Sequence, residues 1–100
     1  MLVFIKLGGS LITDKNIAAS YRREMVQRLG EEIRDALSQN PALRIIVGHG
    51  SGSFGHFVAK QHGTVQGVQT PQQWCGFAEV ATTAAHLNDL VSMTLQQCGL

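Results

Sequence analysis

The chain comprises 100 residues, of which 44% are hydrophobic and 15% charged, and its formal net charge is +1. This composition is typical of a globular domain and excludes disordered and collagen-like chains. The near-neutral charge offers no basic stripe for nucleic acid or an anionic membrane surface, and no apolar run approaches the roughly 20 residues that a membrane span requires.

The first predicted element is a strand over residues 2–7, which begins with the apolar run LVFI. Lys6 interrupts this run after four residues, so a secretory signal peptide is not expected. Residues 8–19 are polar and begin with two glycines. They predict a loop that is long enough to close over a ligand.

An amphipathic helix is predicted from a candidate N-cap at Ser20 to about Gln39. Its apolar stripe recurs every four residues and consists of Met25, Leu29, Ile33 and Leu37. Asn40-Pro41 ends the helix, because the residue before a proline avoids helical geometry. A second apolar strand follows over residues 43–48. The intervening helix predicts that the two strands are parallel and joined by a right-handed crossover.

The second half of the chain is predicted to be helical. A short helix over residues 54–62 and a glycine-containing connector over residues 63–70 precede a long helix that runs from Pro71 to just before Gly99. The long helix is rich in Ala and Thr and carries little charge, which indicates burial on most sides, against the sheet, a partner subunit or a ligand cavity. Cys75 and Cys98 have no His/Cys cluster around them, as is typical of buried, reduced thiols in a cytoplasmic protein.

The predicted sheet is incomplete. Sheets usually contain roughly four to six strands, and a glycine such as Gly99 after a helix normally introduces a further strand. We therefore expect residues 1–100 to form the front portion of one longer α/β domain, with at least half of the sheet outside this sequence.

Each predicted strand runs into a glycine-rich loop. Residues 6–10 read KLGGS, and residues 48–56 read GHGSGSFGH. Glycine gives up side-chain packing so that backbone amides can approach a ligand, and amides before a helix form an anion site, most often for phosphate. Two such loops on neighbouring strands predict two phosphorylated ligands that face each other, which is what phosphoryl transfer requires.

The standard phosphate-binding motifs each fail at one position. Residues 50–55 match G-x-G-x-x-G, but the acidic residue expected about 20 residues later at the end of a strand would be Glu79, inside the predicted helix. The same stretch fits the start of a Walker A loop, where His56 and Phe57 replace the required Lys and Ser/Thr.

What remains is a constellation of cationic side chains around the loops. Lys6 ends the first strand, Lys15 lies in the first loop, and His56 follows the second loop. Cations in these places can compensate phosphate charge and follow a moving phosphoryl group. Structural roles are expected for the other histidines, His49, His62 and His86.

Together these residues resemble the isopentenyl phosphate kinases of the amino acid kinase superfamily. The K-x-G-G-S start is common to the superfamily, whereas the T-D-K of residues 13–15 combined with the G-S-F-G-H of residues 52–56 is more specific. His86-Leu87-Asn88 in the long helix also fits. The resemblance covers the whole chain but only the first part of a typical member. It implies a three-layer αβα sandwich with a mainly parallel sheet, and a cytoplasmic homodimer when the protein is full length.

The implied reaction is the ATP-dependent phosphorylation of isopentenyl phosphate to isopentenyl diphosphate, with Mg²⁺ as a cofactor and no metal ligand among these residues. The implied nucleotide-binding residues are Lys6, Leu7, Gly8, Gly9, Ser10 and Gly52. The implied acceptor-binding residues are Ser51, Gly55 and His56. The implied catalytic residues are Lys6, Lys15 and His56, with Lys15 stabilising the phosphoryl group in transfer. Many members carry Gly or Ala at position 51, but the contact is through the amide. The isoprenoid pocket would take wall residues from Trp74, Phe77, Ala78, Ala81 and Thr82.

Three other interpretations stay open. One is another small phosphate or phosphonate kinase of the superfamily, such as a fosfomycin-type or nucleoside-monophosphate kinase. A second is a non-catalytic nucleotide-binding module. The third is an inert fragment, because the 100 residues contain no recognisable adenine pocket and Asp14 is the only acidic residue in the loops.

Overall fold

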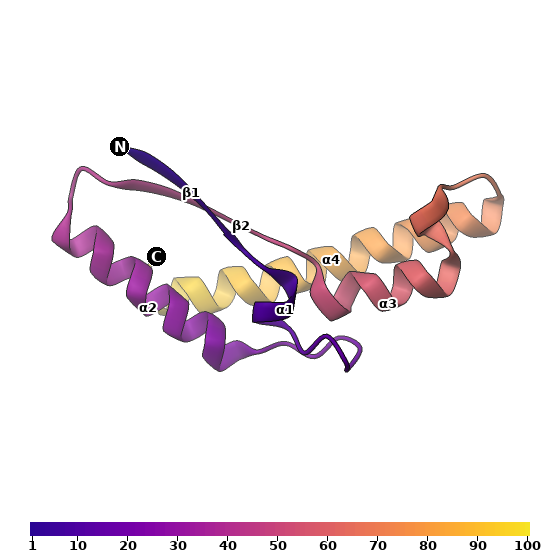
Figure 1. Ribbon diagram of the computed structural model, residues 1–100, viewed down its shortest axis with the longest axis horizontal. Coiled ribbons are helices and arrows are strands. Elements are labelled where there is room, and N and C mark those ends of the chain that lie inside the picture. The colour runs from indigo at the N-terminus through magenta and orange to yellow at the C-terminus, as the bar shows by residue number, and fades with distance from the viewer.

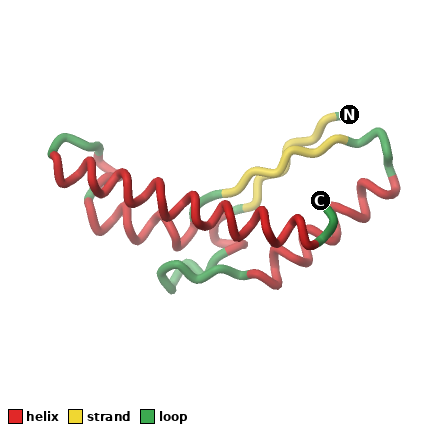
Figure 2. Tube along the Cα trace, turned by 180° about the vertical axis from the view of Figure 1, so that it is seen from behind, coloured by secondary structure: helices red, strands yellow, loops and turns green.

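The computed structural model describes all residues from Met1 to Leu100, in an elongated shape of 51 × 26 × 17 Å. Two strands lie side by side, and the helices lie on one side of them in both views (Figures 1 and 2). The elements are β1 (Leu2–Leu7), α1 (Gly9–Ile12), α2 (Arg23–Gln39), β2 (Arg44–His49), α3 (Gly52–His62), a 3₁₀ turn (Thr64–Gln66) and α4 (Pro71–Gln97).

The two strands pair in parallel, as the sequence predicts. The register runs from Leu2 opposite Arg44 to Leu7 opposite His49. The amide of Gly50 extends the ladder by donating to the carbonyl of Leu7 at 3.1 Å. Because parallel strands end at the same edge of a sheet, the loops after β1 and β2 begin side by side.

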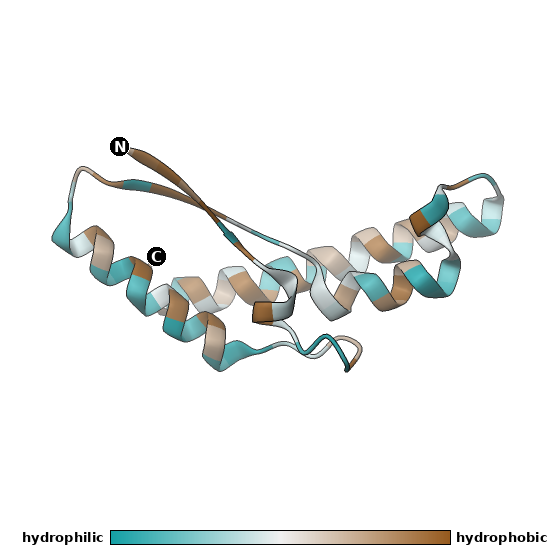
Figure 3. Cartoon of the chain, in the orientation of Figure 1, coloured by the Kyte–Doolittle hydropathy of each residue, from teal (hydrophilic) through white to brown (hydrophobic).

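The sheet is covered on one face only. On the uncovered side, Leu2, Phe4 and Ile46 are 58%, 67% and 49% exposed. On the other side, Leu7 is buried and Val47 packs against the core. Figure 3 colours most of β1 as hydrophobic, because both faces of the strand carry apolar residues. Two-sided apolar strands are typical of a parallel sheet that is covered by helices on both faces.

The core lies where the C-terminal end of β1 meets the four helices. Its members are Leu7, Ile12, Val26, Phe54, Leu87 and Val91. Ile12, Val26 and Leu87 are fully buried, and burial of each such side chain stabilises the fold by about 1.5–3 kcal/mol. Because the core contains residues from α1 and α3, the two glycine loops are anchored to its centre.

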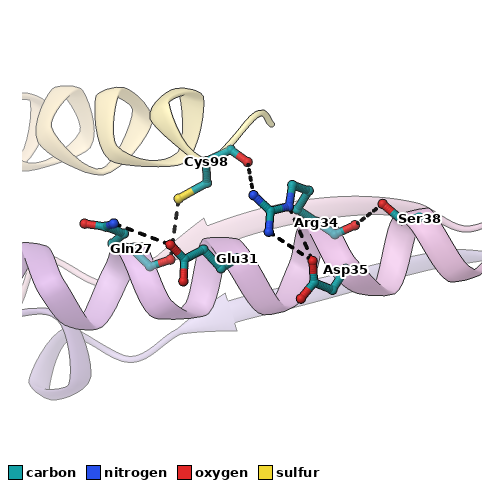
Figure 4. Close-up of polar contacts among 6 residues, drawn as sticks. All are labelled: Gln27, Glu31, Arg34, Asp35, Ser38 and Cys98. Carbon is teal, nitrogen blue, oxygen red and sulfur yellow. Dashed lines mark hydrogen bonds and ion pairs between the residues drawn. The ribbon is translucent and has the colours of Figure 1, made fainter.

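The C-terminal end of α4 docks closely on α2. A Cβ atom on Gly30 would lie 2.8 Å from Cys98 Sγ, so only glycine permits this helix spacing. The Cys98 thiol donates to the carbonyl of Gln27 at 3.4 Å, and Arg34 reaches the carbonyl of Cys98 at 3.5 Å (Figure 4). No helix is long and apolar enough to cross a membrane.

The structure corrects the predicted start of α2. The helix begins at Arg23, and its N-cap residue, Arg22, makes no side-chain cap. Ser20 is therefore not the N-cap, and its amide donates to Ser53 Oγ at 3.3 Å. Tyr21 forms an isolated antiparallel bridge with Thr13. The loop predicted over residues 8–19 is likewise partly wrong, because residues 9–12 form a helical turn.

The burial predicted for the long helix is only partly correct. Gly76, Leu87, Val91 and Thr94 are its buried residues, whereas its N-terminal part projects beyond the sheet with α3 as a helical hairpin (Figure 1). Trp74 is 58% exposed there. Cys75 is exposed and Cys98 is buried, and both are free, so the expectation of two buried thiols is wrong for Cys75.

Tyr21 should make the stability of the fold sensitive to alkaline pH. Its hydroxyl lies 2.6 Å from Thr94 Oγ1 and 3.3 Å from the carbonyl of Leu90. Burial raises the pKa of Tyr21, and this effect exceeds the opposing hydrogen bond from Thr94 and the charge of Arg23. The protonated Tyr21 hydroxyl thus contributes its full stabilisation below the pKa of about 10 that tyrosine has in the unfolded state. This contribution is lost as pH rises through the higher pKa of Tyr21 in the folded state.

The corresponding experiment compares the intact protein with Tyr21→Phe by denaturant unfolding between about pH 8 and pH 11. We expect the wild type to lose more unfolding free energy than the variant above about pH 10. Parallel curves for the two proteins would contradict this role of the Tyr21 hydroxyl.

Candidate active site

The two glycine loops contact each other backbone to backbone. A Cβ atom on Gly9 would lie 2.6 Å from the amide nitrogen of Gly52, and one on Gly50 would lie 3.2 Å from the amide nitrogen of Gly9. Gly52 also has a positive φ of 51°, a conformation that costs other residues roughly 1–2 kcal/mol. Gly9 and Gly52 have no room for a side chain where the two loops meet, and a side chain at Gly50 would be tightly packed.

Backbone amides in both loops are free to bind a ligand. The amides of Gly8, Gly9 and Ser10 in the first loop donate no hydrogen bond within the chain, and neither do those of Ser51 and Gly52 in the second. Gly52 is nevertheless a buried residue. Buried amides are almost always paired. An anion at the junction of the loops would therefore supply the missing acceptors.

The three residues predicted to be cationic lie on the elements and loops next to these amides. Lys6 stands opposite Gly48 at the end of β1. Lys15 lies in the loop after α1, and His56 is in the second turn of α3, which already begins at Gly52. All three are exposed, and none takes part in an ion pair. Exposed polar side chains without an ion-pair partner can reach an external anion.

The loop that carries Lys15 is closed by its own hydrogen bonds. The amide of Asp14 donates to the carbonyl of Ser20 at 3.0 Å, and Asp14 accepts from Ile17 through its carbonyl at 3.2 Å. The carboxylate Oδ1 of Asp14 accepts from the amide of Asn16 at 3.0 Å. Lys15 therefore projects from a short, internally bonded turn.

Sequence reasoning missed Thr13 and Ser53 as residues that connect the loops. Thr13 is fully buried, and its hydroxyl donates to the carbonyl of Gly9 at 2.6 Å. The same oxygen accepts the amide hydrogen of Ser53 at 3.0 Å. One hydroxyl group thus bonds to both glycine loops. The only signal in the sequence is a hydroxyl residue in a glycine-bearing loop, and it does not identify a partner 40 positions away.

The remaining histidines have partners within the chain. The ring of His49 lies 2.9 Å from the carbonyl of Gly50 through Nδ1 and 3.0 Å from Asn88 Oδ1 through Nε2, which links the second loop to α4. His62 lies 2.6 Å from Glu79 and joins α3 to α4. The ring of His86 packs 6.0 Å from that of Phe54.

The chain does not enclose its glycine loops in a cavity. The surface hollows are lined by α2, by the sheet and by the C-terminal end of α4, and no loop glycine from residue 8 to residue 55 borders one. The hollow beside the start of α2 is lined by Tyr21, Arg22, Arg23, Glu24, Met25 and Arg28. No group of three or more His, Cys, Asp or Glu side chains could hold a metal ion.

The close approach of the loops predicts a large effect for Gly52→Ala. The new methyl group would strain the positive φ and would lie 2.6 Å from the carbonyl oxygen of Gly9. We expect the unfolding free energy to fall by at least about 2 kcal/mol. Gly8→Ala is the matched control, because no atom lies within 4 Å of its added Cβ. Equal unfolding midpoints for the two variants in a denaturant titration would contradict the close packing of the loops.

Comparison with known proteins finds relatives that match the whole chain. The sequence profile of the amino acid kinase family matches residues 1–100. The isopentenyl phosphate kinase of Methanocaldococcus jannaschii is 34% identical over 96% of this chain and 39% of its own length. That of Thermoplasma acidophilum is 28% identical over 99% of this chain and 38% of its own length.

Solved structures give the same result. The product complex of the T. acidophilum isopentenyl phosphate kinase superposes with a TM-score of 0.82 at 30% identity, over all of this chain and 40% of that one. A substrate complex of isopentenyl phosphate kinase superposes with a TM-score of 0.83 at 27% identity, over all of this chain and 39% of that one. The chain therefore spans about two-fifths of the length of the relatives it matches.

Proposed function

The chain belongs to the amino acid kinase family, and we propose that the protein carrying it transfers the terminal phosphoryl group of ATP to isopentenyl phosphate, giving isopentenyl diphosphate and ADP. The observation that carries the proposal is the contact between the two glycine loops, with unpaired amides on both sides of it. The similarity to isopentenyl phosphate kinases supplies the identity of the two ligands.

In this proposal the two loops together hold both phosphorylated ligands. The nucleotide phosphates are bound by Lys6, Leu7, Gly8, Gly9, Ser10 and Gly52. The acceptor phosphate is bound by Ser51, Gly55 and His56. Lys6, Lys15 and His56 are the catalytic residues, and Lys15 stabilises the phosphoryl group as it moves between the loops. The exposure of these three side chains and their lack of ion pairs support this assignment.

The chemistry of the acceptor explains why these residue types suffice. A phosphate monoester is already an oxyanion at neutral pH, because its second pKa is about 6, so the site needs no general base. The obstacle is the repulsion between two polyanions. Amides and cations held in fixed positions remove it by stabilising the charge that spreads over the transferring group.

Mg²⁺ is part of the proposed reaction, and in kinases it neutralises charge on the phosphate oxygens. This chain offers it no site of its own. Asp14 is the only carboxylate in the loops, and its Oδ1 already accepts from the amide of Asn16. The residues of this chain therefore do not fit a metal centre, and they act in the proposal through amides and cations alone.

We also propose that the intact protein is a cytoplasmic homodimer. The free thiols of Cys75 and Cys98 agree with a reducing compartment. The apolar residues Leu2, Phe4 and Ile46 on the open face of the sheet agree with a larger assembly, within one subunit or between two.

The direct test is to incubate the intact protein with ATP and isopentenyl phosphate and to detect isopentenyl diphosphate by phosphorus NMR. We expect ADP formation that depends on isopentenyl phosphate and that fosfomycin at equal concentration does not inhibit. Preference for fosfomycin would identify a different kinase of the family. ATP binding without turnover would identify a non-catalytic nucleotide-binding protein. Either result would overturn the proposal.

His56→Ala should impair use of the acceptor selectively. We expect kcat/KM for isopentenyl phosphate to fall at least tenfold, about 1.4 kcal/mol of transition-state stabilisation, with a smaller change in KM for ATP. His86→Ala is the matched control, because that ring packs on Phe54 without a hydrogen bond. An unchanged kcat/KM for His56→Ala in steady-state kinetics would remove His56 from the site.

The exposed part of α4 should determine which lengths of acceptor tail the site accepts. Trp74 and Phe77 pack edge to face there, with ring centroids 5.8 Å apart, and Ala78, Ala81 and Thr82 continue along the helix. Trimming Trp74 or Phe77 to Ala should enlarge the pocket and raise the relative kcat/KM for prenyl phosphates longer than isopentenyl phosphate. If substitutions at all five positions leave the chain-length preference unchanged, the pocket lies elsewhere.

A further inference from the structure

We propose that Thr13 and Ser53 form a clamp that fixes the Lys15 turn against both glycine loops, so that both are positioning residues for the transfer proposed above. Neither side chain is assigned a role in binding or chemistry by the functional proposal. The inference rests on that proposal for the identity of the reaction, whereas the clamp itself rests on hydrogen bonds within the chain.

Ser53 is bonded through all its polar groups to the segment that carries Lys15. It is 2% exposed. Its amide donates to Thr13 Oγ1 at 3.0 Å, and its carbonyl accepts from the amide of Ala19 at 3.2 Å. Its hydroxyl oxygen accepts from the amide of Ser20 at 3.3 Å. A serine in the second glycine loop thus holds both ends of the segment.

Thr13 extends the same clamp to the first loop. Its hydroxyl donates to the carbonyl of Gly9 at 2.6 Å while it accepts from Ser53. Because Thr13 is fully buried, water does not compete for these bonds. The bridge between Thr13 and Tyr21 fixes the segment further where it enters α2. Both loops and the lysine turn therefore share one set of buried contacts.

Lys15 lies between the two clamped ends of this segment. The backbone of residues 13–20 runs close to α1 and α3 in Figure 1, and Ala19 adopts a positive φ of 51° where the segment returns to Ser53. Non-glycine residues adopt this conformation only when their surroundings impose it. The clamp thus fixes the backbone origin of the Lys15 side chain, whose ammonium group stays free of any ion pair.

Such a clamp affects the chemical step more than the binding of either ligand. The ammonium of Lys15 must reach the phosphoryl group while it lies between the loops, and small misplacements of catalytic groups lower rates strongly. In the proposal each ligand alone is held mainly by backbone amides of the two loops, which remain when the clamp is lost. Loss of the clamp should therefore lower kcat while each dissociation constant changes little.

The first experiment compares Thr13→Val with Thr13→Ser in the intact protein. Valine keeps the shape of threonine and removes the hydroxyl, whereas serine keeps the hydroxyl. We expect Thr13→Val to lower kcat at least tenfold with less than threefold change in KM for ATP or the acceptor. Thr13→Ser should restore most of the activity. Equal activity of the two variants, or a loss confined to KM, would overturn the proposal.

The second experiment tests whether the clamp acts through Lys15. Ser53→Ala removes the acceptor for the Ser20 amide, and it provides the test if Thr13→Val does not fold. We expect Ser53→Ala to lower kcat about threefold in the wild type and to have no further effect in a Lys15→Ala background. Ser38→Ala, which removes an exposed hydroxyl bonded to the carbonyl of Arg34 in α2, is the control expected to leave kcat unchanged. If the losses in kcat for Ser53→Ala and Lys15→Ala were additive, Ser53 would act independently of Lys15, and the proposal would be overturned.

Hydrogen exchange separates failure of the clamp from failure of the proposed function. If the wild type transfers no phosphate to isopentenyl phosphate, the function is wrong, but the clamp still predicts slow exchange of the Ser53 amide. Thr13→Val should accelerate that exchange at least tenfold relative to Thr13→Ser. Equal protection of the Ser53 amide in the two variants would overturn the clamp, whatever reaction the protein catalyses.

Discussion

The architecture of the site depends on one contact, the backbone-to-backbone approach of the two glycine loops. It is achieved because β1 and β2 are parallel and in register, so that both end at the same edge of the sheet. It is permitted because Gly9, Gly50 and Gly52 have no side chains. At position 52, glycine also adopts the positive φ at lower cost than any other residue type. The buried residues of α1 and α3 then hold the loops against the centre of the core.

This contact leaves the fold with donors and charges that it does not satisfy itself. The amides beside the contact have no acceptor within the chain, and the nearby cationic side chains have no counter-ion. Among these residues Gly52 is buried, and an unpaired buried donor destabilises a protein. An anion that accepts from its amide would therefore stabilise the second loop. The arrangement favours ligands with many oxygens and high negative charge, and phosphates meet both conditions.

The open surfaces of the chain agree with its relation to longer kinases. The outward face of the sheet exposes Phe4 and Ile46, and the hairpin of α3 and α4 exposes Trp74 and Phe77. The α/β fold expected from the resemblance is confirmed by the structural matches, although the chain itself has one layer of helices on a two-stranded sheet. Its relatives are more than twice as long, and none of its surface hollows is lined by a glycine of the two loops.

The sequence by itself determined the elements whose signals are local. Apolar runs marked both strands, four-residue spacing marked α2, and the glycine clusters marked the loops and the family. Only the tertiary structure decided which polar residues meet. Ser20 has the composition of an N-cap, but Ser53 engages its amide and the helix begins three residues later. Thr13 resembles any loop threonine until folding brings Gly9 and Ser53 to its hydroxyl. Propensity and periodicity describe neighbours along the chain, whereas these bonds join positions up to 40 residues apart, and their partners depend on how the strands and helices pack.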